Sequence, residues 1–250
     1  MRRRCLASTA LLVAVALACT QPRAQQDAPG PYQAVPVTFA KPLGDPTLEA
    51  FRKELTEIAN KKDRAALAGK VVAKGFFWER EDTNVADPKK SGIDNLEAAL
   101  GLDAKDGSGW ELLAIYLADP TAEQVTENKG VVCSPAAPAY SEKDFEQLIQ
   151  TTNSDPTEWA YPTAAGLEMR AKPDSKSPVV EKLAATLLRM YPDETQPEAA
   201  ADWMRLVAPS GKLGYALVSA MMPLVSDQLC YVKEGTGWRI AGYRGGATDQ

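Results

Sequence analysis

Residues 167–183 read LEMRAKPDSKSPVVEKL, and this stretch decides the fold expected for the C-terminal half of the chain. Residues 167–170 alternate apolar and charged side chains, which is the period-two pattern of a half-buried strand. The polar run at 171–178 contains two prolines and is typical of a turn, and the valine-rich segment VVEKL follows at 179–183. The stretch therefore predicts two short strands joined by a polar loop.

The same alternation of short strands and turns continues toward the C-terminus. Apolar runs at 187–191 and 203–207 flank a loop rich in Pro, Glu and Ala at 192–201. A Pro-Ser-Gly turn at 209–212 then leads into a further strand at 213–216. Short strands at this spacing are typical of a small all-β unit.

The segment 158–225 resembles the bacterial SH3 family. The first motif of that family reads approximately leucine-x-valine/methionine-arginine, two further residues and a proline, and LEMRAKP at 167–173 is similar to it. The second motif combines a tryptophan with a glycine-containing hairpin, and here Trp203 precedes a hairpin at 211–216. The chain departs from the family at Tyr215 and Ala216, where tryptophan and valine are usual, and in its long acidic loop at 192–201. The resemblance implies a small barrel that recognises cell-wall peptides or partner proteins in the cell envelope.

A small barrel fills its interior with one alternating set of side chains, which leaves other aromatic residues to line a groove. The candidate ligand-binding residues are Tyr161, Tyr191, Trp203 and Tyr215. Each of them also fits core packing, which is the favoured interpretation for Trp203. Three cations could meet carboxylates of a wall peptide or be solvated charges, namely Lys172, Arg189 and Arg205.

The region 45–157 reads as a mainly helical N-terminal domain. Asp45 and Pro46 predict a helix start, because Asp caps helices and Pro is preorganised at their first position. Ser108 and Glu111 form a capping-box pattern before another apolar run. The helices expected after the first one lie at 63–71, 93–102, 108–118 and 141–151.

The pattern KKDRAALAGKVVAKGFFWERED at 61–82 is similar to the start of cone-fold domains of the nuclear-transport-factor-2-like family, where two helices precede a strand. This weak resemblance extends over 45–82. Phe76, Phe77 and Trp78 open the expected strand, and they read as core, with a small-molecule pocket as the alternative.

The C-terminal segment 226–250 predicts a hairpin. Apolar runs flank the Gly-rich turn at 234–237, and GWRI at 237–240 is similar to the last strand of cone-fold domains. We expect this hairpin to complete the sheet of the N-terminal domain, with the SH3-like domain inserted between. The expected fold class is α+β, with a mainly helical N-terminal domain, a small SH3-like β-barrel and a C-terminal β-hairpin.

The first 24 residues have the form of a secretory signal peptide. Three arginines follow Met1, and residues 6–19 are apolar or small and uncharged. That run is shorter than the roughly 20 apolar residues that span a bilayer. Cleavage before Cys19 fits both an A-x-A site and a loose lipobox that would lipidate Cys19, and cleavage after Ala24 is a third option. The mature protein is expected to be periplasmic or secreted, soluble or lipid-anchored, with residues 25–44 as an extended tether.

Export leaves two cysteines in the mature chain, because Cys5 lies in the signal and Cys19 is removed or lipidated. An even pair in an oxidising compartment predicts a disulfide between Cys133 and Cys230. Two free buried thiols are the alternative.

The chain contains no histidine. Its absence excludes Ser-His-Asp and Cys-His triads and the usual catalytic zinc sites. Without the four arginines of the signal, 24 basic residues stand against 33 acidic ones, which gives a net charge of −9. That charge argues against a nucleic-acid partner and against an anionic membrane surface. No cofactor and no metal are expected.

The favoured function is that of a non-enzymatic, exported cell-envelope protein whose SH3-like module binds a peptidoglycan peptide or an envelope protein. Contact with a membrane would come only through a lipid on Cys19. One alternative is a small-molecule site in a cone-like pocket near residues 76–78. Another is a carboxylate-dependent wall hydrolase that uses Glu79, Glu81 or Asp82, although acidic runs of this kind are usually solvated strand ends.

Overall fold

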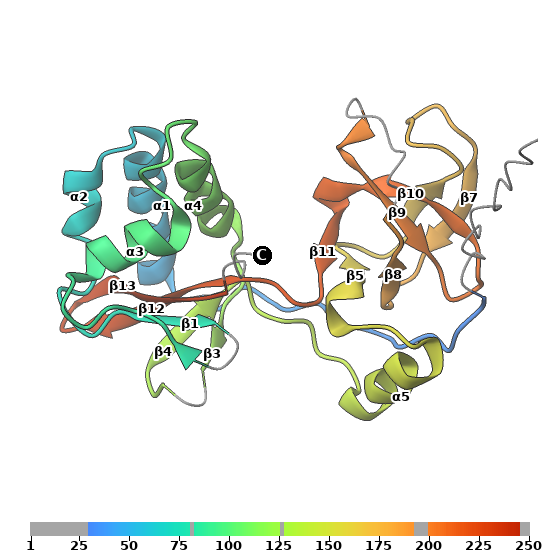
Figure 1. Ribbon diagram of the computed structural model, residues 1–250, viewed down its shortest axis with the longest axis horizontal. Coiled ribbons are helices and arrows are strands. Elements are labelled where there is room, and N and C mark those ends of the chain that lie inside the picture. Colours follow the sequence, from blue (N-terminus) through green and yellow to red (C-terminus); the bar gives the residue numbers. More distant parts are fainter. Residues whose placement is uncertain (1–29, 81–82, 126–127, 193–199, 246–250) are drawn as a thin grey trace, which may run out of the picture.

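The computed structural model describes residues 30–80, 83–125, 128–192 and 200–245, and it shows an α+β protein. Two units lie side by side and are joined by several extended crossings of the chain (Figure 1). We call them the six-stranded unit, residues 45–134 and 228–245, and the seven-stranded unit, residues 135–227. Four expectations concern residues outside the described ranges: the signal at 1–24, Cys19, Glu81 and Asp82.

The six-stranded unit packs four helices on one face of its sheet (Figure 1). Its elements are α1 (Pro46–Asn60), α2 (Arg64–Ala68), β1 (Phe77–Arg80), β2 (Thr83–Asn84), α3 (Gly92–Leu100), α4 (Ser108–Ala118), β3 (Glu123–Gln124), β4 (Val131–Ser134), β12 (Gln228–Glu234) and β13 (Gly237–Arg244). The strand order is β2-β1-β13-β12-β4-β3. The sequence predicted the helices of this region, the strand that opens at 75–78 and a short strand or extended segment at 130–133, which correspond to β1 and β4, but it did not predict β2 and β3.

The C-terminal hairpin forms the centre of this sheet. Strand β13 runs parallel to β1, with Phe77 opposite Gly242. Strand β12 runs antiparallel to β4, with Cys230 opposite Cys133. The side chain of Tyr231 on β12 is fully buried against the helices, so the hairpin carries part of the core as well as the sheet.

Local signals explain where the helices begin. The Asp45 carboxylate accepts hydrogen bonds from the backbone N–H groups of Thr47 and Leu48, so the predicted start of α1 is confirmed. The capping box predicted at Ser108 is wrong. Gly107 is the cap residue, in the left-handed region at φ 80°, and the Asp106 carboxylate accepts the Ser108 N–H instead. A competing local turn therefore replaces the expected cap.

The seven-stranded unit is built from the continuous run between β4 and β12. Its elements are α5 (Glu142–Thr152), the 3₁₀ helix η1 (Pro156–Glu158), β5 (Trp159–Pro162), β6 (Leu167–Arg170), β7 (Val179–Leu183), β8 (Leu188–Met190), β9 (Trp203–Val207), β10 (Leu213–Leu217), the 3₁₀ helix η3 (Val218–Ala220) and β11 (Met221–Pro223). The strand order is β11-β5-β8-β9-β10-β6-β7, and no pairing of β11 with β7 closes the sheet among the described residues. The SH3-like barrel therefore stays a prediction.

Helix α5 packs in the seven-stranded unit and not with the N-terminal helices, to which the sequence assigned it. Phe145 and Leu148 lie in one cluster with Trp159 and Leu187. The Phe145 and Trp159 rings meet edge to face, with centroids 6.3 Å apart.

The segment 30–42 is extended, as the sequence predicts, but it is not a free tether. Val35 and Val37 are buried in the cluster of the seven-stranded unit, and backbone hydrogen bonds join them to the segment 185–187. The Tyr32 hydroxyl donates to the Val207 carbonyl oxygen at 2.8 Å. The segment then crosses to the six-stranded unit and enters α1, so we call residues 30–42 the strap.

Candidate functional site

Three of the four nominated aromatic residues lie on one outer face of the seven-stranded sheet. Met204, Leu206 and Ala216 point into the core of this unit, so strand alternation turns Trp203, Arg205 and Tyr215 to the opposite face. Leu188 and Met190 likewise point inward, and Tyr191 follows on the outer side of β8. We call Tyr191, Trp203, Arg205 and Tyr215 the aromatic face. All four side chains are half-buried.

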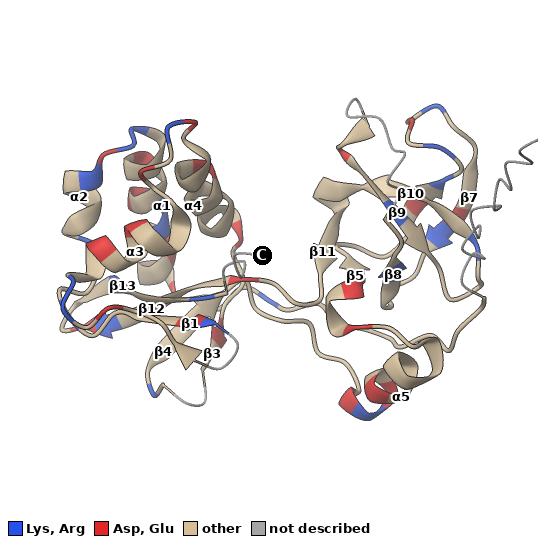
Figure 2. Ribbon diagram, in the orientation of Figure 1, with Lys and Arg blue, Asp and Glu red and all other residues tan. Residues whose placement is uncertain are grey.

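The aromatic face brings arginine and aromatic side chains together. The Arg205 guanidinium lies over the Tyr191 ring, 5.2 Å from its centroid. Tyr215 on β10 is paired with Arg205 on β9 and with Arg170 on β6. Figure 2 shows basic sequence on β9. Each side chain of the aromatic face makes interactions of its own.

The structure does not bring Tyr161 together with the other three aromatic residues. Its side chain is 7% exposed and packs in the cluster that holds Trp159 and the strap. Burial raises the pKa of Tyr161 to about 12. The cavity beside it measures about 30 Å³, which has room for water and not for a peptide side chain.

Arg189 and Lys172, the other two basic residues that could meet ligand carboxylates, differ in their surroundings. The Arg189 guanidinium donates to the Glu158 carboxylate at 2.7 Å and to the Thr152 carbonyl oxygen at 3.2 Å. Arg189 therefore links the end of α5 to β8, which is a structural role. Lys172 is exposed in the turn after β6.

The disulfide between Cys133 and Cys230 is confirmed. The two residues are direct neighbours across β4 and β12, and both are fully buried. They lie on the sheet face opposite the helices, where they form a small cluster with Val125 and Val131.

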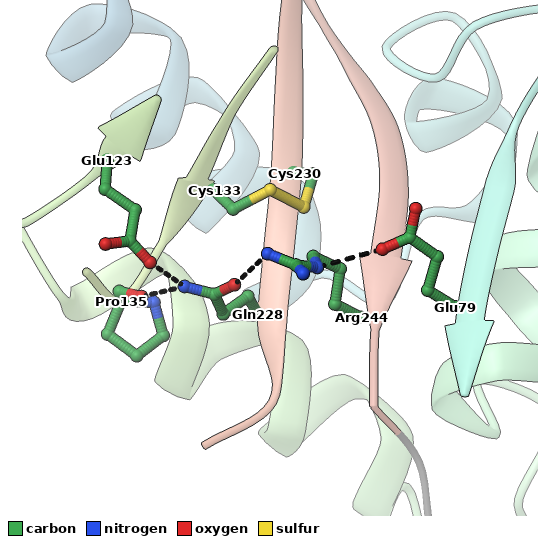
Figure 3. The surroundings of a disulfide bond; sticks show 7 residues. All are labelled: Glu79, Glu123, Cys133, Pro135, Gln228, Cys230 and Arg244. Atoms are coloured by element: carbon green, nitrogen blue, oxygen red, sulfur yellow. Dashed lines mark hydrogen bonds and ion pairs between the residues drawn. A yellow bond between two sulfur atoms is a disulfide. The ribbon is translucent and has the colours of Figure 1, made fainter. Parts of the chain in front are cut away.

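A chain of polar contacts crosses the sheet beside this disulfide (Figure 3). The Gln228 amide nitrogen donates to Glu123 at 2.7 Å and to the Pro135 carbonyl oxygen at 2.7 Å. Arg244 donates to the Gln228 amide oxygen at 3.3 Å and to the Glu79 carboxylate at 2.9 Å. Glu79 is thus ion-paired, and Gln228 and Arg244 stand between it and Glu123, so these two acids do not face each other across a substrate-sized gap.

The aromatic residues of β1 are engaged in packing. Phe76 is buried in the core, and the Phe77 ring covers Gly242 so closely that a Cβ there would lie 2.5 Å from ring carbons. The Trp78 indole N–H donates to the Gly245 carbonyl oxygen at 2.9 Å. These contacts favour the structural interpretation of the aromatic trio.

A cleft that the sequence did not predict lies at the junction of the two units. Its volume is about 660 Å³, and its walls are mostly apolar. Helix α4 supplies one wall, and the segment from β11 to β12 supplies the other. Its lining includes Ile115, Tyr116, Asp119, Met222, Val225 and Asp227. We call this space the junction cleft.

Two tyrosines and an aspartate form a polar cluster at the junction cleft. The Tyr243 hydroxyl donates to the Asp227 carboxylate at 2.6 Å, and the Tyr116 and Tyr243 hydroxyl oxygens lie 3.0 Å apart. Burial raises the pKa of Tyr116 to about 12. Burial and the hydrogen bond to Asp227 raise the pKa of Tyr243 well above its ordinary value. Both hydroxyls therefore stay protonated at neutral pH and hold the carboxylate in place.

One feature of the sequence could have indicated this cleft. Beyond Glu111 every position of the helix at 108–118 holds an apolar residue or a tyrosine, whereas a helix that covers a sheet needs a single apolar stripe. Its buried stripe contains Trp110, Leu113, Tyr116 and Leu117, and Leu112 and Ile115 remain outside it. The excess apolar residues predict a second contact surface, but only the fold identifies the opposite wall.

The part of the chain that the structure describes contains neither a candidate metal site nor a helix suited to span a membrane. No cluster of three or more acidic or cysteine side chains there could hold a metal ion. None of the described helices has the length and apolar character needed to cross a membrane. No family model, curated protein or solved structure matches the chain.

Proposed function

We propose that this is a non-enzymatic, exported protein of the cell envelope that binds an extended peptide on the aromatic face of its seven-stranded unit. The peptide is a stem peptide of the cell wall, with an extended segment of an envelope protein as the second candidate. The proposed cellular location is the periplasm or the exterior, with lipidation of Cys19 as an open possibility.

The observation that carries the proposal is the convergence of Tyr191, Trp203 and Tyr215 with Arg205 on one outer face. Rings of this kind offer flat apolar area at low entropic cost, and tyrosine, tryptophan and arginine dominate the energetics of binding surfaces. A guanidinium next to these rings can pair with a carboxylate through two parallel hydrogen bonds. Wall peptides carry free carboxylates, so the chemistry of the face and of the ligand are complementary.

The resemblance of residues 158–225 to bacterial SH3 domains supports the same proposal. The strands around the quoted motif pair in sequence order, β6 with β7 and β9 with β10, and both hairpins are antiparallel. The departure at Tyr215 falls on the aromatic face itself, so we expect the ligand preference of this chain to differ from that of the family.

Co-sedimentation with purified, insoluble peptidoglycan tests the proposal. The full chain should pellet with the wall material, and soluble stem peptide should release it. Tyr215→Ala and Arg205→Gln should each weaken binding by about tenfold, as expected for central aromatic and arginine contacts. Tyr140→Ala is the matched control, because Tyr140 is a half-buried tyrosine of the same unit that packs against Phe145 and is not one of the residues of the aromatic face.

Thermal unfolding of each variant separates a loss of binding from a loss of fold. The proposal fails if the wild-type chain stays in the supernatant, or if Tyr140→Ala weakens binding as much as Tyr215→Ala at an unchanged unfolding midpoint. Binding that stem peptide does not compete, but that an envelope protein does, would move the assignment to the second candidate.

A further inference from the structure

The two most exposed large hydrophobic side chains of the described residues line the same cleft. Ile115 is 66% exposed and Val225 is 56% exposed, and both border the junction cleft. They come from different units, since Ile115 lies on α4 and Val225 follows β11. Exposed apolar side chains scattered singly over a surface are ordinary, but a group of them in one hollow indicates a binding site for a ligand or a partner.

The size and place of the junction cleft suit a small ligand. A volume of about 660 Å³ falls in the range of roughly 300–1,000 Å³ that is typical of ligand pockets. Such pockets are common where two units meet, with apolar walls and a few polar groups that fix the ligand's orientation. Here Met222 and Pro223 add apolar area beside Val225, and Tyr116 brings a hydroxyl.

The charge of the cleft has one sign. Two carboxylates, Asp119 and Asp227, line it, and no lysine or arginine does among the residues described around it. Asp227 is held in one orientation by Tyr243 and Tyr116, with hydroxyl contacts of 2.6 and 3.5 Å. Gly245 also lies against this carboxylate, since a Cβ at Gly245 would be 2.0 Å from an Asp227 oxygen. A carboxylate fixed in this way offers a preorganised anchor for a positive charge.

We propose that the junction cleft binds a small amphipathic cation. The apolar body of the ligand lies against Ile115, Met222 and Val225, and its ammonium group faces Asp227 and Asp119. Apolar walls alone would accept any hydrophobic molecule of this size, and the two carboxylates select a cationic head over a neutral or anionic one. This site is separate from the aromatic face and does not depend on peptide binding there.

Three probes with the same chain and different heads test the proposal, namely octylammonium, octanol and octanoate. Calorimetric titration of the full chain at neutral pH and low salt should give the tightest binding for octylammonium. Octanol should bind about tenfold more weakly, since it lacks the charge-assisted contact, and octanoate more weakly still. Equal binding of octylammonium and octanoate, or binding of none of the three, overturns the proposal.

Two variants assign the binding to this cleft. Ile115→Ser leaves the core untouched, because Ile115 is 66% exposed, and it should weaken octylammonium about tenfold. Asp227→Asn keeps an acceptor for Tyr243 and should remove the preference for octylammonium over octanol. Val179→Ser is the matched control, since Val179 is a 42% exposed valine on β7 that does not line the cleft.

Any of three results places the site elsewhere or removes it. These are an unchanged affinity in Ile115→Ser, an unchanged head-group preference in Asp227→Asn, and a loss in Val179→Ser equal to that in Ile115→Ser. Ile115→Ser should also pellet with peptidoglycan as the wild-type chain does. Failure of the cleft and failure of the aromatic face therefore give different patterns.

Discussion

The six-stranded sheet is assembled from segments that lie far apart in the chain, whereas the seven-stranded sheet comes from one continuous run. In the first, Phe77 on β1 pairs with Gly242 on β13, and Trp78 donates to Gly245 over 167 residues. In the second, every strand lies between residues 159 and 223. The strap, residues 30–42, reaches this sheet from outside and is roughly as long as two ordinary strands.

The two units are therefore stabilised against unfolding by different means. Closing a long loop costs conformational entropy that non-local contacts must then recover. The six-stranded unit holds its distant segments together with a disulfide between β4 and β12. The seven-stranded unit has no disulfide among its described residues, and it gains its extra contacts from Tyr32, Val35 and Val37 of the strap. Covalent closure and strap packing can therefore be removed separately.

Removal of the disulfide should have the largest effect. The bridge spans 97 residues, and chain entropy alone predicts about 4–5 kcal/mol for a loop of this size. The value is an upper bound, because the folded seven-stranded unit already shortens that loop. In Cys133→Ala/Cys230→Ala, amide hydrogen exchange should accelerate in β12 and β13 far more than in β8–β10. Equal acceleration in both units would contradict the division between them.

Loss of a strap contact should have the next largest effect, in the other unit. Val35 is fully buried, and Val35→Ala should destabilise the seven-stranded unit by about 2 kcal/mol through lost apolar contact and a small cavity. Hydrogen exchange should then accelerate in β8–β10 and not in β12–β13. Leu43→Ala is the control, since Leu43 follows the strap but is 39% exposed. If Val35→Ala leaves hydrogen exchange unchanged in both units, the strap does not contribute to the stability of the seven-stranded unit.

Local signals of the sequence were sufficient for much of this fold. The cap at Asp45, the strand at 203–207 and the Gly-rich turn at 234–237 each act over a few residues. The disulfide followed from counting the cysteines that an exported chain would keep. In the strap, two sequence patterns conflict. Val35, Val37 and Phe39 alternate with other residues, which is typical of a buried extended segment, but the prolines of the same stretch led to the prediction of a tether.

The remaining features depend on contacts between distant segments. Strands β2 and β3 contain two residues each, too few for any periodicity to show. The junction cleft combines α4 with the segment after β11, and the cluster at its edge combines Tyr116, Asp227 and Tyr243 from three separate stretches. The surplus apolar residues on α4 could indicate one wall, but neither pattern nor spacing could identify its partner.

The smallest predicted effect concerns a buried tyrosine at the centre of the six-stranded unit and depends on pH. Burial raises the pKa of Tyr231 from 10.0 to about 12. Between pH 10 and about 12, the folded state therefore keeps the Tyr231 hydroxyl proton, whereas the unfolded state releases it. The stability contributed by the neutral hydroxyl is complete below pH 10, and it is lost as the pH rises from about 10 toward 12.

Tyr231→Phe removes this group and should reduce the alkaline loss of stability by about 1 kcal/mol at pH 11. At pH 8 the variant should differ little from the wild type, because phenylalanine keeps the ring in the same core. Urea unfolding at the two pH values measures both quantities. Tyr161→Phe offers the same comparison in the seven-stranded unit, since burial also raises the pKa of Tyr161 to about 12. If the two units unfold separately at high pH, each substitution protects only its own unit, whereas a single cooperative transition would respond equally to both.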